Sequence, residues 1–195
     1  AVITVIVLAY DFLFHKDKSG NAEKSGNLSA ASAAAKPLAV TKRFALLQQY
    51  QVIAPAHLAK NGKFADLDFI LVGIFGLLCV KCVGLGGEIY GNMNDDNWLQ
   101  VQKGVRKSFP NPLAQAEADT RLVRDTLFTA KLKNVPVETI VIFTNKKAAL
   151  ALPRSTGHYT PKAFKALLRK SSYLANKGVD IAKATDAVRA YLTQA

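Results

Sequence analysis

The stretch ADLDFILVGIFGLLCVKCVGLGGEIYG, residues 65–91, decides the fold of this chain. Its two short apolar runs, DLDFILVG and GLLCVKCVG, predict two β-strands, since runs of this length bounded by turn residues are typical of buried strands. The connection from Gly73 to Gly76 is short and bounded by glycine, which suits a β-hairpin. A glycine-rich segment, residues 84–87, then leads out of the second strand. The stretch therefore predicts a buried pair of adjacent strands.

The segment before these strands predicts a helix and a second hairpin. Apolar residues recur at helical spacing in residues 37–50, so we expect a helix there. Residues 50–58 predict a strand closed by Pro55. The pair Asn61-Gly62 is a turn signal, and it predicts a hairpin between the flanking residues.

The segment after these strands predicts a covering helix and another buried strand. Asn111 and Pro112 occupy the positions expected for a helix N-cap and the first helical residue. The residues that follow form a long amphipathic helix whose apolar positions share one face. Residues 137–145, VETIVIFTN, then predict a buried strand. A helix followed by a buried strand is typical of an α/β domain, in which a mixed central β-sheet is flanked by helices.

The two ends of the chain differ in composition from residues 37–153, which we expect to form the globular α/β domain. Residues 1–15 are nearly all apolar, residues 16–36 form a polar linker, and residues 154–195 form a basic helical extension. Spanning a bilayer takes about 20 apolar residues. Residues 1–15 therefore predict either the tail of a membrane anchor or a short element packed on the domain. The basic extension predicts either a solvated helical surface or one that binds phosphates or lipid headgroups.

The chain is strongly basic. It carries 26 lysine and arginine residues against 14 acidic residues, a formal net charge of +12. This balance favours an anionic partner, either nucleic acid or an acidic membrane surface, and does not choose between them. Cys79 and Cys82 lie in an apolar run without a second cysteine pair, so we expect both to be buried apolar residues. The three histidines, His15, His57 and His158, are expected on surfaces or loops, apart from carboxylate clusters.

Phosphodiester hydrolysis by bound metal needs carboxylates to hold Mg²⁺ and a cation near the reacting oxygens. One Asp at the start of a strand and a Glu-x-Lys on the next strand meet this need, because residues two apart in a strand share a face. The residues quoted above, with a later Trp, FPNPLAQ opening a helix and VETIVIFTN, resemble the nuclease-related domain family of the restriction-endonuclease-like superfamily. The resemblance covers residues 37–153, and the positions that match in order are Gly76, Gly87, Ile89, Tyr90, Gly91, Trp98, Asn111, Pro112 and Gln115.

The sequence departs from the family pattern at its chemical centre. Asp68 occupies the position of the family's metal-binding aspartate, but Lys81 stands at the Glu position and Val83 at the Lys position. The first predicted helix also lacks the acidic residue that the family tends to carry. By resemblance, Asp68, Lys81 and Gln115 are the residues of a remnant, incomplete catalytic site. We expect Lys81 to form an ion pair with Asp68 and to occupy the place of a metal ion.

These observations predict a catalytically degenerate nuclease-related domain that binds nucleic acid or a protein partner. One alternative is an active Mg²⁺-dependent nuclease in which Asp68 holds the metal with a migrated carboxylate, from Glu88 or Glu117. Another is a membrane-tethered structural module. No cofactor is expected, apart from Mg²⁺ if the site is active, and no small-molecule cofactor is implied. The expected localisation is cytoplasmic, with a tether to the inner face of the membrane through the N-terminus.

Overall fold

A computed structural model of the chain describes residues 26–153 and 156–193. Its centre is a five-stranded sheet in the order β1-β4-β5-β9-β11. Strands β1, β4 and β5 are antiparallel, whereas β5, β9 and β11 run parallel to one another. The sheet is therefore mixed. The five strands are β1 (Gln51–Ile53), β4 (Phe69–Gly73), β5 (Gly76–Val83), β9 (Val137–Phe143) and β11 (His158–Tyr159).

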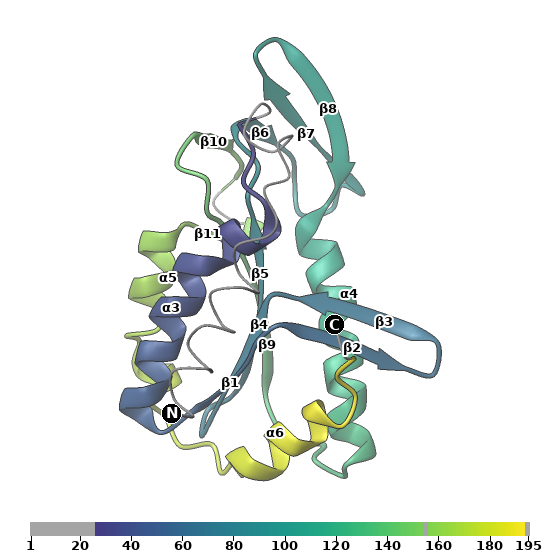
Figure 1. The fold of residues 1–195 in the computed structure, drawn as a ribbon, viewed down its shortest axis with the longest axis vertical. Helices are drawn as coiled ribbons and strands as arrows, with labels where there is room; N and C mark the ends of the chain where they lie inside the picture. Colours follow the sequence, from purple (N-terminus) through teal and green to yellow (C-terminus); the bar gives the residue numbers. More distant parts are fainter. Residues whose placement is uncertain (1–25, 154–155, 194–195) are drawn as a thin grey trace, which may run out of the picture.

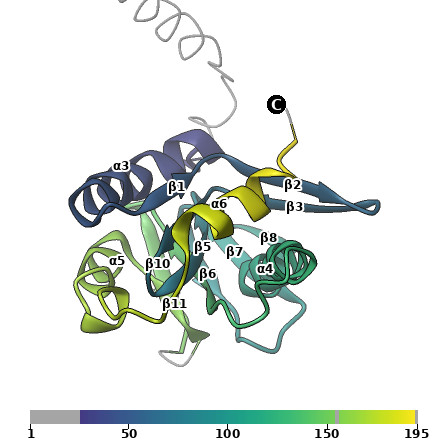
Figure 2. The ribbon, with the colours of Figure 1, turned by 90° about the horizontal axis from the view of Figure 1, so that it is seen from below.

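Two pairs of helices cover the faces of this sheet. Helices α3 (Ala30–Gln48) and α5 (Pro161–Leu167) pack on one face, and α4 (Pro112–Thr129) and α6 (Ile181–Arg189) pack on the other (Figures 1 and 2). Alternate residues of β5 serve the two faces: Leu78 and Val80 face the first pair, and Leu77 and Cys79 face the second. Both faces are thus apolar, which explains why β4 and β5 read as continuous apolar runs.

Two smaller sheets extend from the central one. Strands β10 (Ala148–Ala151), β6 (Gly87–Tyr90), β7 (Asn97–Gln102) and β8 (Val105–Pro110) form a four-stranded sheet in that order. Strands β2 (Ala56–Lys60) and β3 (Lys63–Leu67) form a two-stranded hairpin. Figure 1 shows that the β7–β8 hairpin and the β2–β3 hairpin both project from the body of the molecule. The short 3₁₀ helix η2 (Ser171–Tyr173) follows α5.

The predicted fold class, a mixed α/β sheet flanked by helices, is confirmed, and three boundaries differ. The first helix begins at Ala30 instead of residue 37, so the last residues of the predicted linker are helical. The Ser29 side chain caps this helix, and Ala33 is buried against Gly84. The predicted strand over residues 50–58 is split into β1 and β2, and Asp68 lies between β3 and β4. Both predicted hairpin turns are present.

The segment after residue 153 forms the predicted helices, and these helices belong to the core. Phe164 and Tyr173 pack against α3 and the sheet, and Val179 and Val188 pack with α4 on the other face. Predictions for residues 1–15 and for the linker before residue 26 lie outside the described residues. Among the residues that the structure describes, no helix is both long and apolar enough to cross a membrane.

Candidate functional site

Asp68 lies at the junction of β3 and β4, opposite β5. Extending the register of the pair Phe69 and Val80 by one residue places Asp68 across from Lys81. Its backbone N–H donates to the Val80 carbonyl over 3.0 Å, and its Oδ2 accepts the backbone N–H of Cys82 over 2.6 Å. Asp68 thus binds the backbone of the strand where the family carries its catalytic residues. Burial raises the pKa of Asp68, although the Cys82 hydrogen bond and the charge of Lys81 act in the opposite direction.

Lys81 forms its ion pair with Asp66, and the predicted pair with Asp68 was wrong. The Lys81 ammonium lies 2.7 Å from Asp66 Oδ2 and 2.7 Å from the backbone carbonyl of Asp66. Lys81 therefore contacts both the backbone and the side chain of one residue on β3. Lys81 still acts on Asp68 through its charge.

His57 also contacts Asp66, which corrects the expectation that the histidines lie apart from carboxylates. The β2–β3 register places His57 directly across from Asp66, and Nδ1 lies 2.8 Å from Oδ1. Partial burial would raise the pKa of Asp66, but the hydrogen bond and charge of Lys81, followed by those of His57, hold it below its ordinary value. Asp66 is therefore a carboxylate with a cationic partner on one oxygen and an imidazole on the other.

A further carboxylate, Asp119, reaches this cluster from α4. Its carboxylate accepts a hydrogen bond from the backbone N–H of Asp66. Burial raises the pKa of Asp119, while that hydrogen bond and the charge of Lys81 act to lower it. Asp119 also borders a hollow of about 360 Å³ between β3 and α4, together with Lys63 and Arg121. We call Asp66, Asp68, Lys81, His57 and Asp119 the strand-junction cluster.

The other residues proposed from the sequence lie apart from the contacts of Asp68. Glu117, on α4, is held by Arg124 Nη1 at 2.5 Å and by the Thr139 hydroxyl at 3.0 Å. Glu88 lies on β6 in the four-stranded sheet, where its carboxylate accepts the Tyr90 hydroxyl. Gln115 is exposed on the first turn of α4, one turn before Asp119. Neither glutamate contributes a second carboxylate to Asp68 through any contact described here.

Both cysteines are buried thiols, as the apolar run predicts. Cys79 is fully buried beneath α4, and burial raises its pKa to about 12 despite a hydrogen bond with Thr120. Cys82 packs on the opposite face of the sheet, and burial raises its pKa as well. Thiols in this state are poor nucleophiles and poor metal ligands, because both roles require the thiolate.

The remaining motif residues build the scaffold around the cluster. Asn111 caps α4 by accepting the N–H of Leu113 over 2.9 Å, and its amide donates to the backbone carbonyls of Met93 and Asp95. Trp98 is buried, stacks on Phe143 at a ring-centroid distance of 6.1 Å, and donates its indole N–H to the Asn92 carbonyl. These contacts join the acidic loop 92–96, the four-stranded sheet and the start of α4 into one unit.

Comparison with protein families agrees with this arrangement. The family model described as "NERD: Nuclease-related domain" matches residues 30–144, more than half of the chain. The chain belongs to the nuclease-related domain family. The match begins at the first residue of α3 and ends just after β9, so it includes every residue of the strand-junction cluster. A search of curated proteins found no match.

The strand-junction cluster of this nuclease-related domain does not fit the Mg²⁺ ion that the superfamily implies. Mg²⁺ needs several oxygen ligands in octahedral geometry. Here the ammonium of Lys81 binds two oxygens of Asp66, and Asp68 Oδ2 accepts a backbone N–H. Within residues 26–153 and 156–193, no three histidine, cysteine, aspartate or glutamate side chains are arranged to hold a metal ion.

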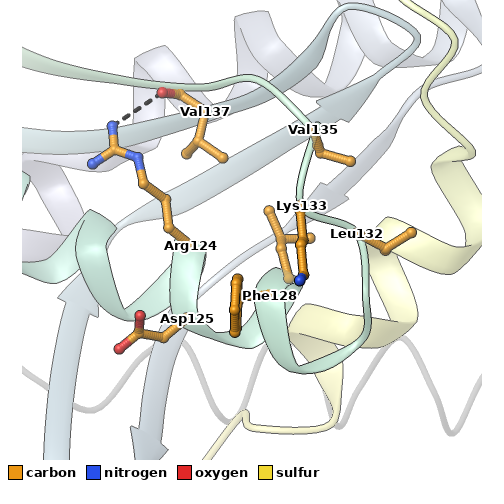
Figure 3. A pocket seen from close by; sticks show the side chains of 8 residues that line it. Arg124, Asp125, Phe128, Leu132, Lys133, Val135 and Val137 are labelled. Atoms are coloured by element: carbon orange, nitrogen blue, oxygen red, sulfur yellow. Dashed lines mark hydrogen bonds between the residues drawn. The ribbon is translucent and has the colours of Figure 1, made fainter.

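A second hollow, of about 220 Å³, lies at the far end of α4, where the chain turns into β9 (Figure 3). Arg124 borders it and donates to the Val137 carbonyl over 3.1 Å, and Lys133 lies over the ring of Phe128 at 4.7 Å. No member of the strand-junction cluster lines this hollow. Arg124 is also ion-paired with Glu117 on α4.

Proposed function

We propose that this nuclease-related domain binds nucleic acid without cleaving it. The observation that supports the loss of cleavage is the position of Lys81, whose ammonium is bound by Asp66 where the family carries a metal-binding glutamate. A cation held by two protein oxygens neutralises Asp66 and disfavours a divalent ion beside it, because like charges repel. Gln115 is exposed on α4 one turn before Asp119, at the border of this cluster, and its amide would contact a bound strand.

Charge supports nucleic acid as the partner. A basic protein attracts a phosphate backbone through a sequence-independent, salt-sensitive interaction. The strand-junction cluster itself contains three carboxylates against Lys81 and His57, so it does not attract phosphates. The contacts must therefore come from basic residues around the cluster.

A cleavage assay tests the first half of the proposal. Supercoiled plasmid and single-stranded DNA and RNA are incubated with Mg²⁺ or Mn²⁺ and with either the wild-type protein or Asp68→Ala. We expect the same background from both proteins. Cleavage by the wild type that disappears in Asp68→Ala would instead favour the active-nuclease alternative.

A binding assay tests the second half. Fluorescence anisotropy with labelled duplex and single-stranded oligonucleotides, measured at several salt concentrations, should give an affinity that falls steeply as salt increases. Absence of binding at low salt would refute the proposal. A salt-independent affinity would also refute it, because phosphate neutralisation is the basis of the expected interaction.

A membrane surface is a second candidate partner, supported by the outer face of α3. Leu46 and Leu47 are 81% and 74% exposed, and they follow Lys42 and Arg43 on a helix without acidic residues. Exposed apolar side chains beside cations are typical of helices that lie on anionic lipid. Flotation with phosphatidylcholine vesicles, with or without phosphatidylserine, should show binding to the anionic vesicles that Leu46→Ser/Leu47→Ser weakens. Equal flotation of both proteins would remove this candidate.

A further inference from the structure

The β7–β8 hairpin forms the outer edge of the four-stranded sheet. Strand β6 pairs with residues 99–101 of β7, so the hairpin becomes a two-stranded ribbon only beyond the row of Val101 and Arg106, from Gln102 to Val105. Six residue pairs join its strands, from Asn97 with Pro110 to Gln102 with Val105. Its base is fixed by the buried Trp98, whose ring packs edge-on against Phe109. Beyond this base, every residue from 103 to 108 is exposed, including Val105 at 67%. The outer part of the ribbon therefore presents both of its faces to solvent (Figure 1).

The ribbon itself is basic, and the nearest acidic residue in the sheet is Glu88 of β6, which lies in the cross-strand row of Val101 and Arg106 and accepts the Tyr90 hydroxyl. Residues 97–110 contain Lys103, Arg106 and Lys107 and no acidic residue. Lys103 lies in the turn, and Arg106 and Lys107 are neighbours on β8, so they point to opposite faces of the ribbon. Cations at the tip and on both faces match a partner that presents phosphates on two sides of an inserted element.

We propose that the β7–β8 ribbon enters the major groove of double-stranded DNA, where Arg106 and Lys107 contact the phosphates of the two opposing strands. This inference rests on the proposed function, nucleic-acid binding, and specifies the substrate and the contact surface. The major groove of B-DNA is about 12 Å wide and admits a two-stranded ribbon. From the row of Val101 and Arg106, where β6 begins, to Lys103 in the turn, the ribbon extends about 7 Å at the usual rise per strand residue, which is close to the groove depth of about 8.5 Å.

The dimensions favour duplex DNA over other nucleic acids. The major groove of A-form RNA is deep and too narrow for such an element. Nonspecific single-strand binding relies on aromatic platforms, and residues 102–108 at the end of the ribbon contain no aromatic residue. The exposed Val105 offers an apolar contact of the kind made with a thymine methyl group.

The position of the ribbon directs the duplex toward the strand-junction cluster. Strand β8 leads through Asn111 into α4, and Asp119 of that helix contacts Asp66 on the β2–β3 hairpin. The N-terminal half of α4, with Gln115, therefore lies between the two projecting hairpins. A duplex held by the ribbon would pass beside the remnant site, as expected if the domain keeps the binding mode of a nuclease after losing its metal ligands.

Charge reversal on the ribbon tests the inference. Arg106→Glu/Lys107→Glu is compared with Lys162→Glu/Lys165→Glu, which makes the same change in net charge on α5, across the sheet from α4. The charges of β8 could instead serve only to keep an edge strand from pairing with other chains. The glutamate variant preserves that protection, so gel filtration and thermal unfolding should show folded protein of unchanged size.

Anisotropy with a duplex DNA, a duplex RNA and a single-stranded DNA of equal length gives the readout. For wild-type protein we expect duplex DNA to bind at least about tenfold more tightly than the other two. The ribbon variant should lose about tenfold or more in affinity for duplex DNA, and the slope of log K against log salt should fall by about 2, since each lost phosphate contact removes about 0.9. The α5 variant should change affinity less than about threefold.

The outcomes separate this inference from the proposed function. If wild-type protein binds none of the three probes, nucleic-acid binding itself fails, and the ribbon inference fails with it. If wild-type protein binds but both variants lose affinity equally, general charge explains binding, and the ribbon inference alone is overturned. Preference for duplex RNA or single-stranded DNA would also overturn it.

Discussion

Asp66 and Asp68 are separated by one residue, yet their surroundings shift their pKa values in opposite directions. Asp66 has Lys81 and His57 on its two oxygens, and its pKa is lowered. Asp68 is more buried and receives a neutral backbone N–H, and burial raises its pKa. The ionised form of Asp66 is therefore more favourable in the folded than in the unfolded state. For Asp68 burial makes the ionised form less favourable, and the hydrogen bond from the Cys82 backbone N–H on β5 offsets part of this cost.

This difference predicts how substitutions at Asp68 affect stability. Asp68→Ala leaves the partly buried N–H of Cys82 without its acceptor and should lower the free energy of unfolding by about 1–3 kcal/mol. Asp68→Asn retains an acceptor oxygen and should be more stable than Asp68→Ala. Urea unfolding followed by tryptophan fluorescence measures both. Equal stability of the two variants would show that the hydrogen bond to Cys82 contributes nothing.

The raised pKa of Asp68 also predicts how the free energy of unfolding changes with pH. Because the folded state raises the pKa of Asp68, it binds a proton more tightly than the unfolded state does, and stability from this group increases as pH falls. The stability of the wild type relative to Asp68→Asn should therefore rise as pH falls from neutral toward the ordinary pKa of an aspartate, about 4. Asp180, whose pKa is lowered by hydrogen bonds from Lys183, provides the opposite case. The wild type should lose stability relative to Asp180→Asn as pH falls.

Substitution of Lys81 tests whether its ammonium occupies the place of a metal. Lys81→Glu introduces the residue that the family resemblance implies at this position and adds a fourth carboxylate to Asp66, Asp68 and Asp119, so the variant should melt at a lower temperature than the wild type. Millimolar Mg²⁺ or Mn²⁺ should then raise its melting temperature, by a few degrees if binding contributes about 1–2 kcal/mol. Lys81→Gln, which adds no carboxylate, serves as the control and should not respond. A Mg²⁺-dependent rise in the wild type that Asp68→Ala abolishes would contradict this interpretation.

Some partners in the strand-junction cluster could be predicted from the sequence. A two-residue turn at Asn61-Gly62 fixes the register that pairs His57 with Asp66, and Asp66 lies two residues before Asp68. The pairing of Lys81 with Asp66 could not be predicted in the same way. It depends on a break between β3 and β4 at Asp68, and hydrophobic periodicity predicted a single strand over DLDFILVG. Asp119 was missed because contact between a helix and a strand depends on tertiary packing.

At the level of elements, the motif from Ile89 to Trp98 is explained by packing. Gly91 lies against the ring of Trp98, and a Cβ atom at this glycine would lie 2.3 Å from Cγ of the indole. The indole cannot move away, because it is buried and stacked on Phe143. The glycine and the tryptophan of the family pattern therefore form one packing unit.

This contact predicts different costs for two glycine substitutions in the same sheet. Gly91→Ala should destabilise the protein by about 3 kcal/mol or more, because overpacking against a fixed ring distorts the sheet. Gly104→Ala places its methyl group in open space and has only the positive φ of the turn to accommodate, at about 1 kcal/mol. Urea unfolding compares them, with the fluorescence of the single tryptophan as a local probe. Equal losses would show that the ring yields.

The elements were more predictable than their ends. Hydrophobic periodicity and turn residues predicted the strands of the central hairpin, the capped helix after Asn111 and the strand that follows it. The start of α3 was missed because its first turns are rich in alanine and serine, which also suit a linker. Their burial becomes evident only once Ala33 packs on the glycine at position 84.

At the scale of the whole molecule, the family match and the packed core have different ends. The match stops at residue 144, but β11 joins the central sheet, and α5 and α6 complete its two faces. Residues 154–195 contain eight lysine and arginine residues, which conceal the apolar stripe of this segment. The basic composition of residues 154–195 therefore predicted a helical extension outside the domain, but apolar side chains of this segment belong to the core on each face of the central sheet.

Removal of this segment should abolish folding. A chain ending at Pro153 loses buried side chains that each contribute about 1.5–3 kcal/mol, and together they exceed the total stability of a typical domain, about 5–15 kcal/mol. The lost side chains include Phe164, Leu167, Leu168, Tyr173 and Val188. Circular dichroism should show no cooperative thermal transition. Phe164→Ala in the full chain, a milder change, should cost about 3–5 kcal/mol. A cooperative transition in the shortened chain would contradict the prediction.

The edge of β2 that does not pair with β3 is covered by residues 191–193, which follow α6. The backbone N–H of Thr193 donates to the His57 carbonyl over 2.9 Å, and Leu192 forms a β-bridge with Leu58, so these contacts join residues up to 136 positions apart. During synthesis on the ribosome, the β2–β3 hairpin emerges long before the residues that cover its edge. For that interval β2 offers unpaired backbone groups to neighbouring nascent chains, which makes this edge the place where misassembly between copies would begin.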